Sequence, residues 1–336
     1  MLNINDKSVS KKDFITVEFF YKNTKKLFHL KLLNKNANLD RKILDQNLHR
    51  PGLALAGFVD LFAYKRVQVF GNTEMRYLNH LSDDEQKNSL NKIFQFEIPC
   101  IILSNSNKPT KALQKVAEEH RVPLFRSGFT TTKISYLISD FLDDQFAERI
   151  TMHGSFVDVY GVGMLFVGKS GIGKSEVALD LVERGHRLVA DDVVILTKKG
   201  EGILMGAGTD LVKHFMEIRG LGVIDVERMF GIRAIRYQKR LEIVVELEIW
   251  DEHGEYTRTG LSEKSVVISD VEILYIKLPI LPGKNITVIS EVIALNYLLK
   301  HYGFDAAKIF KERLNSRLNQ KSKGQRGIDY FEHDFE

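Results

Sequence analysis

Gly168-Lys169-Ser170-Gly171-Ile172-Gly173-Lys174-Ser175 is the stretch that decides how this chain is interpreted. Its pattern, glycine, four residues, glycine, lysine, serine, is that of a loop that wraps a polyphosphate. The glycines let the backbone turn tightly and aim its N–H groups inward, and the lysine adds a positive charge. The sequence therefore predicts a phosphate-binding loop whose eight residues contact ATP, with the Ser175 hydroxyl on Mg²⁺.

The segments on either side of this loop fit the prediction. Residues 157–167 are apolar and strand-like, and residues 175–185 have the spacing of an amphipathic helix that ends at Gly185. Strand, loop and helix are the arrangement that phosphate binding requires. A chance glycine-rich turn is the alternative, and the complete pattern with the correct flanks argues against it.

The overall composition favours a protein of two domains, because 336 residues exceed one ordinary domain. Lys and Arg number 48 against 44 Asp and Glu, so the formal charge of +4 argues against a nucleic-acid-binding protein. The start has no secretion-signal layout, and no uncharged apolar run approaches membrane-spanning length. We expect a cytoplasmic protein with neither a membrane nor a nucleic-acid partner. The single cysteine, Cys100, lies in an apolar run and is interpreted as a buried strand residue.

The first half of the chain alternates between helix-like and strand-like segments, which predicts an α/β domain with some parallel sheet. Residues 14–20 fit either a strand or a short helix, and residues 126–132 fit either an anion site at a helix start or a hydroxyl-rich helix cap. No catalytic cluster is evident here. We expect a domain of unassigned role at residues 1–148 and a catalytic domain at 149–336. The further segments are predicted as strands at 66–71, 98–103 and 122–125 and helices at 83–93, 109–120 and 131–147.

Two adjacent carboxylates, Asp191 and Asp192, lie in the strand-like segment 187–195. Neighbouring strand residues point to opposite faces, so both can serve one ligand only if the strand ends or bends there. One is expected to meet the magnesium ion and phosphates, and the other to be free for proton transfer. Two ionised groups buried within a strand would be costly for structure alone, which favours a functional role.

Residues 216–225 combine Glu217 and Arg219 with two glycines, which suits a loop folded over a metal–phosphate cluster; a pair of turns joined by an ion pair is the alternative. Arg258 and the predicted rigid turn at 279–285, with Pro282, Gly283 and Lys284, are each as compatible with solvent exposure as with a site. The remaining segments of this half are predicted as a strand at 240–250 and helices at 290–301 and 305–318.

Two incomplete motifs exclude other nucleotide-binding classes. Gly161-Val162-Gly163 begins a dinucleotide fingerprint but has Phe166 at its third glycine position. Residues 107–110 resemble a guanine-specificity box but lack its closing aspartate, and they precede the phosphate loop. Neither a Rossmann site nor a small GTPase is expected, and the signatures of eukaryotic protein kinases are absent.

Together, His153-Gly154, Gly168 to Glu176, Asp191-Asp192 and above all Met216-Glu217-Ile218-Arg219-Gly220-Leu221-Gly222-Val223-Ile224-Asp225 closely resemble the bifunctional HPr kinase/phosphorylases of bacteria. The resemblance is strong from Met152 to about His301 and general in the first half. It implies an enzyme that phosphorylates a serine of the phosphocarrier protein HPr with ATP or pyrophosphate. It also implies that the same site removes this phosphate with inorganic phosphate, releases pyrophosphate, and so regulates sugar transport and carbon metabolism. The family resemblance further implies a homohexamer and a catalytic core similar to phosphoenolpyruvate carboxykinase.

The resemblance assigns roles to individual residues of this sequence. It implies active-site roles for His153, Lys174, Asp192 and Arg258, places Ser175 and Glu217 on Mg²⁺, and matches residues 279–284 to a dephosphorylation segment. One departure is Lys169, because the family commonly has an acidic residue after the first glycine of the loop; an added cation there can alter nucleotide affinity. A small-molecule kinase or carboxykinase with the same loop, or a nucleotide-driven regulatory module without phosphotransfer, are the alternatives.

Overall fold

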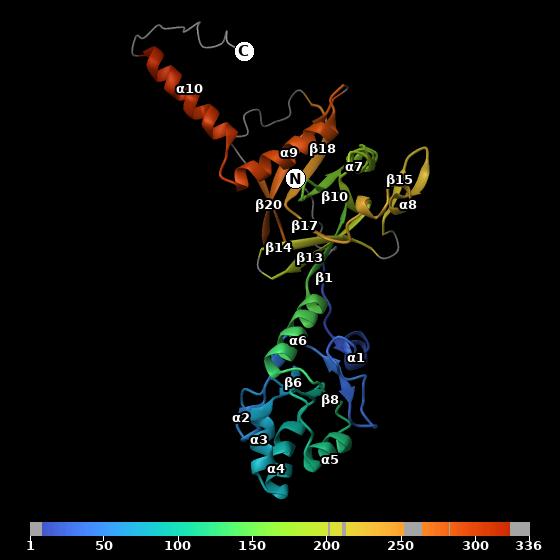
Figure 1. Cartoon of the computed structure of the whole chain (residues 1–336), viewed down its shortest axis with the longest axis vertical. Helices are drawn as coiled ribbons and strands as arrows, with labels where there is room; N and C mark the ends of the chain where they lie inside the picture. Colours follow the sequence, from blue (N-terminus) through green and yellow to red (C-terminus); the bar gives the residue numbers. More distant parts are fainter. Residues whose placement is uncertain (1–8, 201, 210–212, 252–263, 282, 323–336) are drawn as a thin grey trace. The chain divides into compact units, whose positions relative to one another are not determined.

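The chain folds into two compact units. The computed structural model describes residues 9–200, 202–209, 213–251, 264–281 and 283–322, without side-chain detail at 319–322 (Figure 1). One unit is Ser10–Glu148, and the other contains Val9 and the described residues from Arg149 onward. The two-domain α/β architecture predicted from the sequence is confirmed.

A five-stranded sheet in the order β3-β8-β7-β6-β5 forms the centre of the first unit. Strands β5 to β8 are parallel, and β3 is antiparallel to β8. Its strands are β3 (Lys31–Leu32), β5 (Leu48–His49), β6 (Val67–Phe70), β7 (Ile101–Leu103) and β8 (Leu124–Arg126). The helices are α1 (Val17–Thr24), α2 (Gly52–Leu55), α3 (Asn72–His80), α4 (Asp83–Phe94), α5 (Lys111–Glu119) and α6 (Thr131–Phe146). Apolar clusters cover both faces of the sheet, which explains why β6 and β7 are buried along their whole length.

Helix capping bears on both open assignments in the first unit. Most of segment 14–20 is helical: after the short strand β2 (Ile15–Thr16), which pairs with β4 (Lys42–Ile43), the Thr16 hydroxyl accepts a hydrogen bond from Phe19 N at 3.1 Å and caps α1. The Thr130 hydroxyl caps α6 in the same way by accepting from Lys133 N at 3.4 Å. The hydroxyls of segment 126–132 therefore include a helix cap.

The second unit contains two larger sheets, a hairpin and several helices. A six-stranded sheet has the order β12-β10-β11-β18-β20-β19, and a five-stranded sheet has the order β1-β9-β13-β14-β17. The first comprises β12 (Arg187–Ala190), β10 (Ser155–Val159), β11 (Val162–Gly168), β18 (Ile243–Ile249), β20 (Val271–Ile280) and β19 (Lys264–Ile268). The second comprises β1 (Val9–Ser10), β9 (Arg149–His153), β13 (Val193–Lys199), β14 (Ile203–Gly208) and β17 (Lys239–Arg240). The remaining elements are β15 (Phe215–Ile218), β16 (Gly222–Asp225), α7 (Lys174–Glu183), α8 (Val226–Phe230), a 3₁₀ turn (Ile232–Ala234), α9 (Ile286–His301) and α10 (Ala306–Ser322).

The six-stranded sheet forms the middle layer of this unit. Met164 and Phe166 of β11 pack with residues of α7 and α9, whereas the alternating Leu165 and Val167 pack with residues of the five-stranded sheet. Strands β11, β18 and β20 run parallel to one another. Their carboxyl ends therefore meet at one edge, where ligands of α/β proteins commonly bind.

Three predicted segments differ from the structure in shape. Residues 157–167 are not one strand but the hairpin β10–β11, because Tyr160 and Gly161 have φ of 51° and 85° and reverse the chain. Residues 216–225 are not an open loop but belong to the hairpin β15–β16, in which Glu217 pairs with Val223. Pro279 and Ile280 are still part of β20, so the predicted turn begins only at Leu281.

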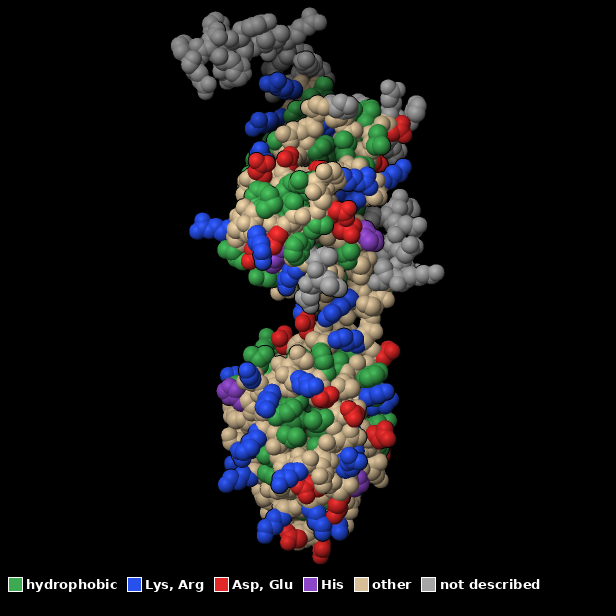
Figure 2. Space-filling model, turned by 90° about the vertical axis from the view of Figure 1, so that its right-hand side faces the viewer, with side chains coloured by type: hydrophobic (Ala, Val, Ile, Leu, Met, Phe, Trp, Pro, Cys, Tyr) green, Lys and Arg blue, Asp and Glu red, His purple; other side chains and the backbone are tan. Residues whose placement is uncertain are grey.

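The surface carries charges of both signs. Figure 2 shows Lys and Arg side chains interspersed with Asp and Glu side chains on the face that it draws. Among the described helices, none combines the length and the apolar character that crossing a bilayer would require.

Candidate functional site

The predicted phosphate loop connects the carboxyl end of β11 to the start of α7. Gly171 and Gly173 have φ of 78° and 101°, a backbone region that favours glycine, and Gly173 is the N-cap residue of α7. The Lys174 ammonium donates to the carbonyl oxygens of Gly168 and Lys169, both at 3.2 Å. The predicted order of strand, loop and helix is confirmed, and the loop lies at the edge where the parallel strands end.

The hairpin β15–β16 contributes Arg219 to this loop. The Arg219 guanidinium donates to the Ser170 hydroxyl at 3.3 Å. A Cβ atom on Gly171 would lie 2.3 Å from Nη1 of Arg219, so a larger residue there would displace the guanidinium from its present position. Glu217 is an exposed residue of β15, a strand that contacts α7. The hairpin thus places the positive charge of Arg219 at the predicted phosphate loop. It also places the Glu217 carboxylate on β15, which packs against α7, the helix that follows the loop.

Asp191 forms a buried hydroxyl–carboxylate cluster with two serines. The Ser175 hydroxyl lies 3.1 and 2.9 Å from the two carboxylate oxygens, and the Ser155 hydroxyl donates to Oδ1 at 2.5 Å. The side chain of Asp191 is almost inaccessible to solvent, and burial raises the pKa of its carboxyl. Asp191 is thus the carboxylate that meets the phosphate loop, and Ser155 is a partner that the sequence reasoning missed.

Asp192 lies in a different environment from its neighbour, because the predicted strand 187–195 is interrupted between β12 and β13. Asp192 has φ of 63°, and the chain bends there. This bend turns the Asp192 carboxylate outward, where it is 74% exposed and its Oδ1 lies 3.8 Å from Nδ1 of His153, which is itself 78% exposed. The structure therefore brings His153 and Asp192 together as an accessible pair beside the buried Asp191.

The chemistry of Ser175 and Asp191 suits a hard cation, because a hydroxyl and a carboxylate are oxygen donors of the kind that Mg²⁺ prefers. No group of three or more His, Cys, Asp or Glu residues that could hold a metal occurs within the described ranges. Glu217 has no described contact that joins it to Ser175.

The predicted dephosphorylation segment is described in part. Gly283 has φ of 82°, and Lys284 N donates to the Leu281 carbonyl at 3.1 Å, so a tight turn precedes α9. Pro282 and Arg258 lie outside the described residues.

Helix α9, which follows this turn, is tied to α7, which follows the phosphate loop. The Thr287 hydroxyl donates to Asp180 at 2.9 Å. Glu291 accepts from the Arg184 guanidinium at 2.9 and 2.6 Å, and its Oε1 lies 3.0 Å from Nε2 of the buried His186. The neighbouring Arg184 is the main reason that the pKa of the Glu291 carboxyl is lowered. These contacts join the helices that follow the two segments assigned to phosphate chemistry, and no local pattern in the sequence indicates them.

Comparisons with known proteins identify relatives over the whole chain. The family model "HPr Serine kinase C-terminal domain" matches residues 144–314, and "HPr Serine kinase N terminus" matches residues 15–142. The HPr kinase/phosphorylase of Chloroherpeton thalassium is 58% identical over 97% of this chain and 98% of the relative. That of Prosthecochloris aestuarii is 52% identical over 100% of both chains. A solved structure, the HPr(Ser) kinase/phosphatase from Coxiella burnetii, is 32% identical over 48% of this chain and 97% of that chain, with a TM-score of 0.43.

Proposed function

Since the chain belongs to the HPr kinase/phosphorylase family, we propose that it phosphorylates a serine of the phosphocarrier protein HPr and also reverses this modification. In the forward reaction the serine hydroxyl attacks the terminal phosphoryl group of ATP or pyrophosphate and loses its proton, and the bond to the rest of the donor breaks to release ADP or inorganic phosphate. In the reverse reaction inorganic phosphate attacks the phosphoserine, which gives HPr and pyrophosphate. One observation carries this proposal: Asp191 joins the phosphate loop through Ser175, and the accessible pair of Asp192 and His153 lies directly beside it.

The phosphate loop binds the donor in this proposal. The Lys174 ammonium donates to two backbone carbonyls of its own loop, and it is positioned to exchange these contacts for the phosphate oxygens of a donor. Arg219 adds a second positive charge through its contact with Ser170. Such fixed cations and N–H groups stabilise the negative charge of the transferring phosphoryl group.

Magnesium binding is assigned to Ser175, Asp191 and Glu217, which offer one hydroxyl and two carboxylates. The ion would supply charge neutralisation for the phosphates of the donor. The buried Asp191 also orients Ser175 through two short contacts. The neighbouring Asp192 lies beside His153 instead and has no role in orienting Ser175 in this proposal.

Asp192 is the proposed proton acceptor of the forward reaction. Its exposure leaves the carboxylate accessible to a protein substrate, and a positioned base of this kind contributes about 10²–10⁴-fold to the rate. By microscopic reversibility the same group returns the proton in the reverse reaction. His153, at 3.8 Å, is proposed to orient the Asp192 carboxylate or to share its proton.

The turn with Gly283 and Lys284 is proposed to guide the incoming inorganic phosphate, together with Arg258 and Pro282, which lie outside the described residues. A fixed positive charge there serves a phosphate nucleophile that only the reverse reaction needs. We further propose a homohexamer, a cytoplasmic location and a core similar to phosphoenolpyruvate carboxykinase, all from the family resemblance.

The direct test is to assay the purified protein in both directions with HPr. Phosphoserine should form on HPr with ATP or pyrophosphate and Mg²⁺, and phosphoserine-HPr with inorganic phosphate should yield pyrophosphate. Labelled ATP with cell metabolites instead of HPr tests the small-molecule kinase. Nucleotide binding without transfer to any acceptor would indicate the regulatory module.

A further inference from the structure

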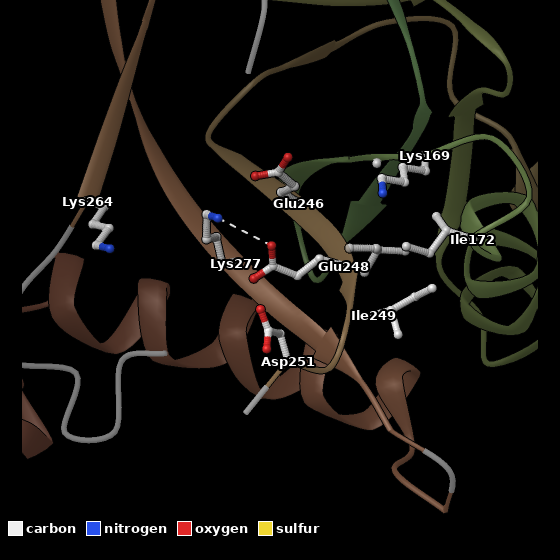
Figure 3. A pocket seen from close by; sticks show the side chains of 10 residues that line it. Lys169, Ile172, Glu246, Glu248, Ile249, Asp251, Lys264 and Lys277 are labelled. Carbon is white, nitrogen blue, oxygen red and sulfur yellow. Dashed lines mark hydrogen bonds and ion pairs between the residues drawn. The ribbon is translucent and has the colours of Figure 1, made fainter. Parts of the chain in front are cut away.

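A pocket opens on the side of the phosphate loop where β18 and β20 end. It has a volume of about 530 Å³. That volume lies within the usual range for small-molecule sites, about 300–1,000 Å³. Lys169 and Ile172 of the loop form one side together with Ile249 at the end of β18, and Glu246, Glu248 and Lys277 of β18 and β20 form the other (Figure 3). The loop that we assign to the donor phosphates thus also forms one wall of a space large enough for more than phosphate.

Two carboxylates of β18 line this pocket side by side. Glu246 and Glu248 are two residues apart, so they lie on the same face of the strand, whereas the intervening Leu247 is buried on the other face. Glu248 accepts from Lys277 at 3.3 Å, and Glu246 accepts from the Tyr275 hydroxyl. Each of these contacts involves one carboxylate oxygen and leaves the second available as a hydrogen-bond acceptor. Carboxylates in such an arrangement suit a ligand with several hydroxyl groups.

The order of the strands separates this pocket from the proposed proton-transfer residues. In the sequence β12-β10-β11-β18-β20, strand β11 leads into the phosphate loop. Asp191 follows β12 and His153 precedes β10 on one side of β11, whereas Glu246, Glu248 and Lys277 come from β18 and β20 on the other side. A donor held by the loop can therefore direct its transferable phosphoryl group to one side and the rest of the molecule into the pocket.

We propose that this pocket binds the nucleoside of the ATP donor, with the ribose hydroxyls hydrogen-bonded to Glu246 and Glu248. Lys169 adds positive charge for the phosphates nearest the ribose, which gives a role to the unusual lysine of the loop. Ile172 and Ile249 lie on the same side of the pocket and offer apolar contact to the base (Figure 3). The inference rests on the proposed use of ATP. Pyrophosphate has no nucleoside, so the use of ATP should depend on the carboxylates of the pocket and the use of pyrophosphate should not.

The test compares ATP and pyrophosphate as donors for the same HPr preparation. Glu248→Gln removes the negative charge but keeps the size of the side chain. Hydrogen bonds to charged groups are worth more than neutral ones, and we expect kcat/KM for ATP, relative to that for pyrophosphate, to fall about tenfold. Glu272→Gln is the matched control: Glu272 lies near the amino end of β20, is exposed and accepts a hydrogen bond from Ser265. This control variant should keep the wild-type ratio.

An ATP analogue probes the same contact without any change in the protein. 2′,3′-Dideoxy-ATP lacks the ribose hydroxyls, and the wild-type enzyme should use it about tenfold less efficiently than ATP. In Glu248→Gln this loss should be smaller, because the hydroxyls have already lost their charged partner.

Three outcomes would overturn the assignment of the pocket. These are equal use of ATP and the dideoxy analogue by the wild-type enzyme, an unchanged donor ratio in a folded Glu248→Gln, and an equal loss with both donors. The last result would indicate a structural or effector role. None of these outcomes contradicts the proposed function. That function is contradicted only if the wild-type protein transfers phosphate to HPr from neither donor.

Discussion

Replacing Asp192 by Asn removes the proposed proton acceptor at little structural cost. The carboxylate is 74% exposed, and substitutions at exposed positions usually change the free energy of unfolding by at most about 0.5 kcal/mol. The backbone of Asp192 has φ of 63°, which Asn tolerates as well as Asp does, so the substitution adds no strain. The rates should therefore report the loss of the acceptor alone. We expect phosphorylation and dephosphorylation to fall together by about 10²–10⁴-fold, or about 2.7–5.5 kcal/mol.

Asp270→Asn is the matched control for this experiment. Asp270 is also exposed, has φ of 60° and pairs with Lys198 at 3.3 Å, but it lies in the turn between β19 and β20, away from the carboxyl ends of the parallel strands. Both variants should melt within a few degrees of the wild-type protein, and only Asp192→Asn should lose activity. Initial rates of phosphoserine formation and of pyrophosphate release measure the two directions. A loss in only one direction, or less than tenfold in both, would refute the shared-proton reasoning.

Four further substitutions test other parts of the site. Lys174→Ala should abolish phosphotransfer in both directions while the circular dichroism spectrum stays native; a folded variant with wild-type rates would exclude the loop as the donor site. Lys284→Ala should slow dephosphorylation more than phosphorylation, and equal slowing of both rates would remove the incoming-phosphate role. Gly171→Ala should lower the rate of phosphotransfer. The new Cβ atom would lie 2.3 Å from Nη1 of Arg219, and the backbone φ of 78° adds about 1–2 kcal/mol of strain for a residue other than glycine. Wild-type rates at all ATP concentrations would contradict this close packing. Cys100→Ala should keep full activity and lower the free energy of unfolding by about 1 kcal/mol, since Cys100 is completely buried among apolar residues; an inactive but folded variant would place chemistry in the first unit.

Much of the second unit could be predicted from local sequence. The glycine spacing of residues 168–175 predicted the loop, because glycine readily adopts the positive φ that the turn requires at Gly171 and Gly173. In the first unit, helices with clear apolar spacing were also predicted closely: residues 131–147 correspond to α6 at Thr131–Phe146. The paired carboxylates Asp191 and Asp192 were recognised with the condition that the strand must bend there, and it does.

Turns between strands were harder to predict. The apolar run 157–167 has the composition of one long strand, and its reversal at Tyr160 and Gly161 is stabilised by the antiparallel pairing of β10 with β11. The hairpin β15–β16 was likewise mistaken for a loop, since its two short strands satisfy each other's backbone groups only once they are paired.

By itself, the sequence determined the α/β class, the strand–loop–helix arrangement around residues 168–175 and the family, because periodicity, glycine spacing and motif residues are properties of neighbours along the chain. Only the tertiary structure decided which side chains share a site. Ser155 meets Asp191 across 36 positions, Arg219 meets Ser170 across 49, and Thr287 meets Asp180 across 107. Such contacts depend on the order and register of strands and on the packing of helices against them. These are set by the burial of apolar faces from distant segments, which no local pattern records.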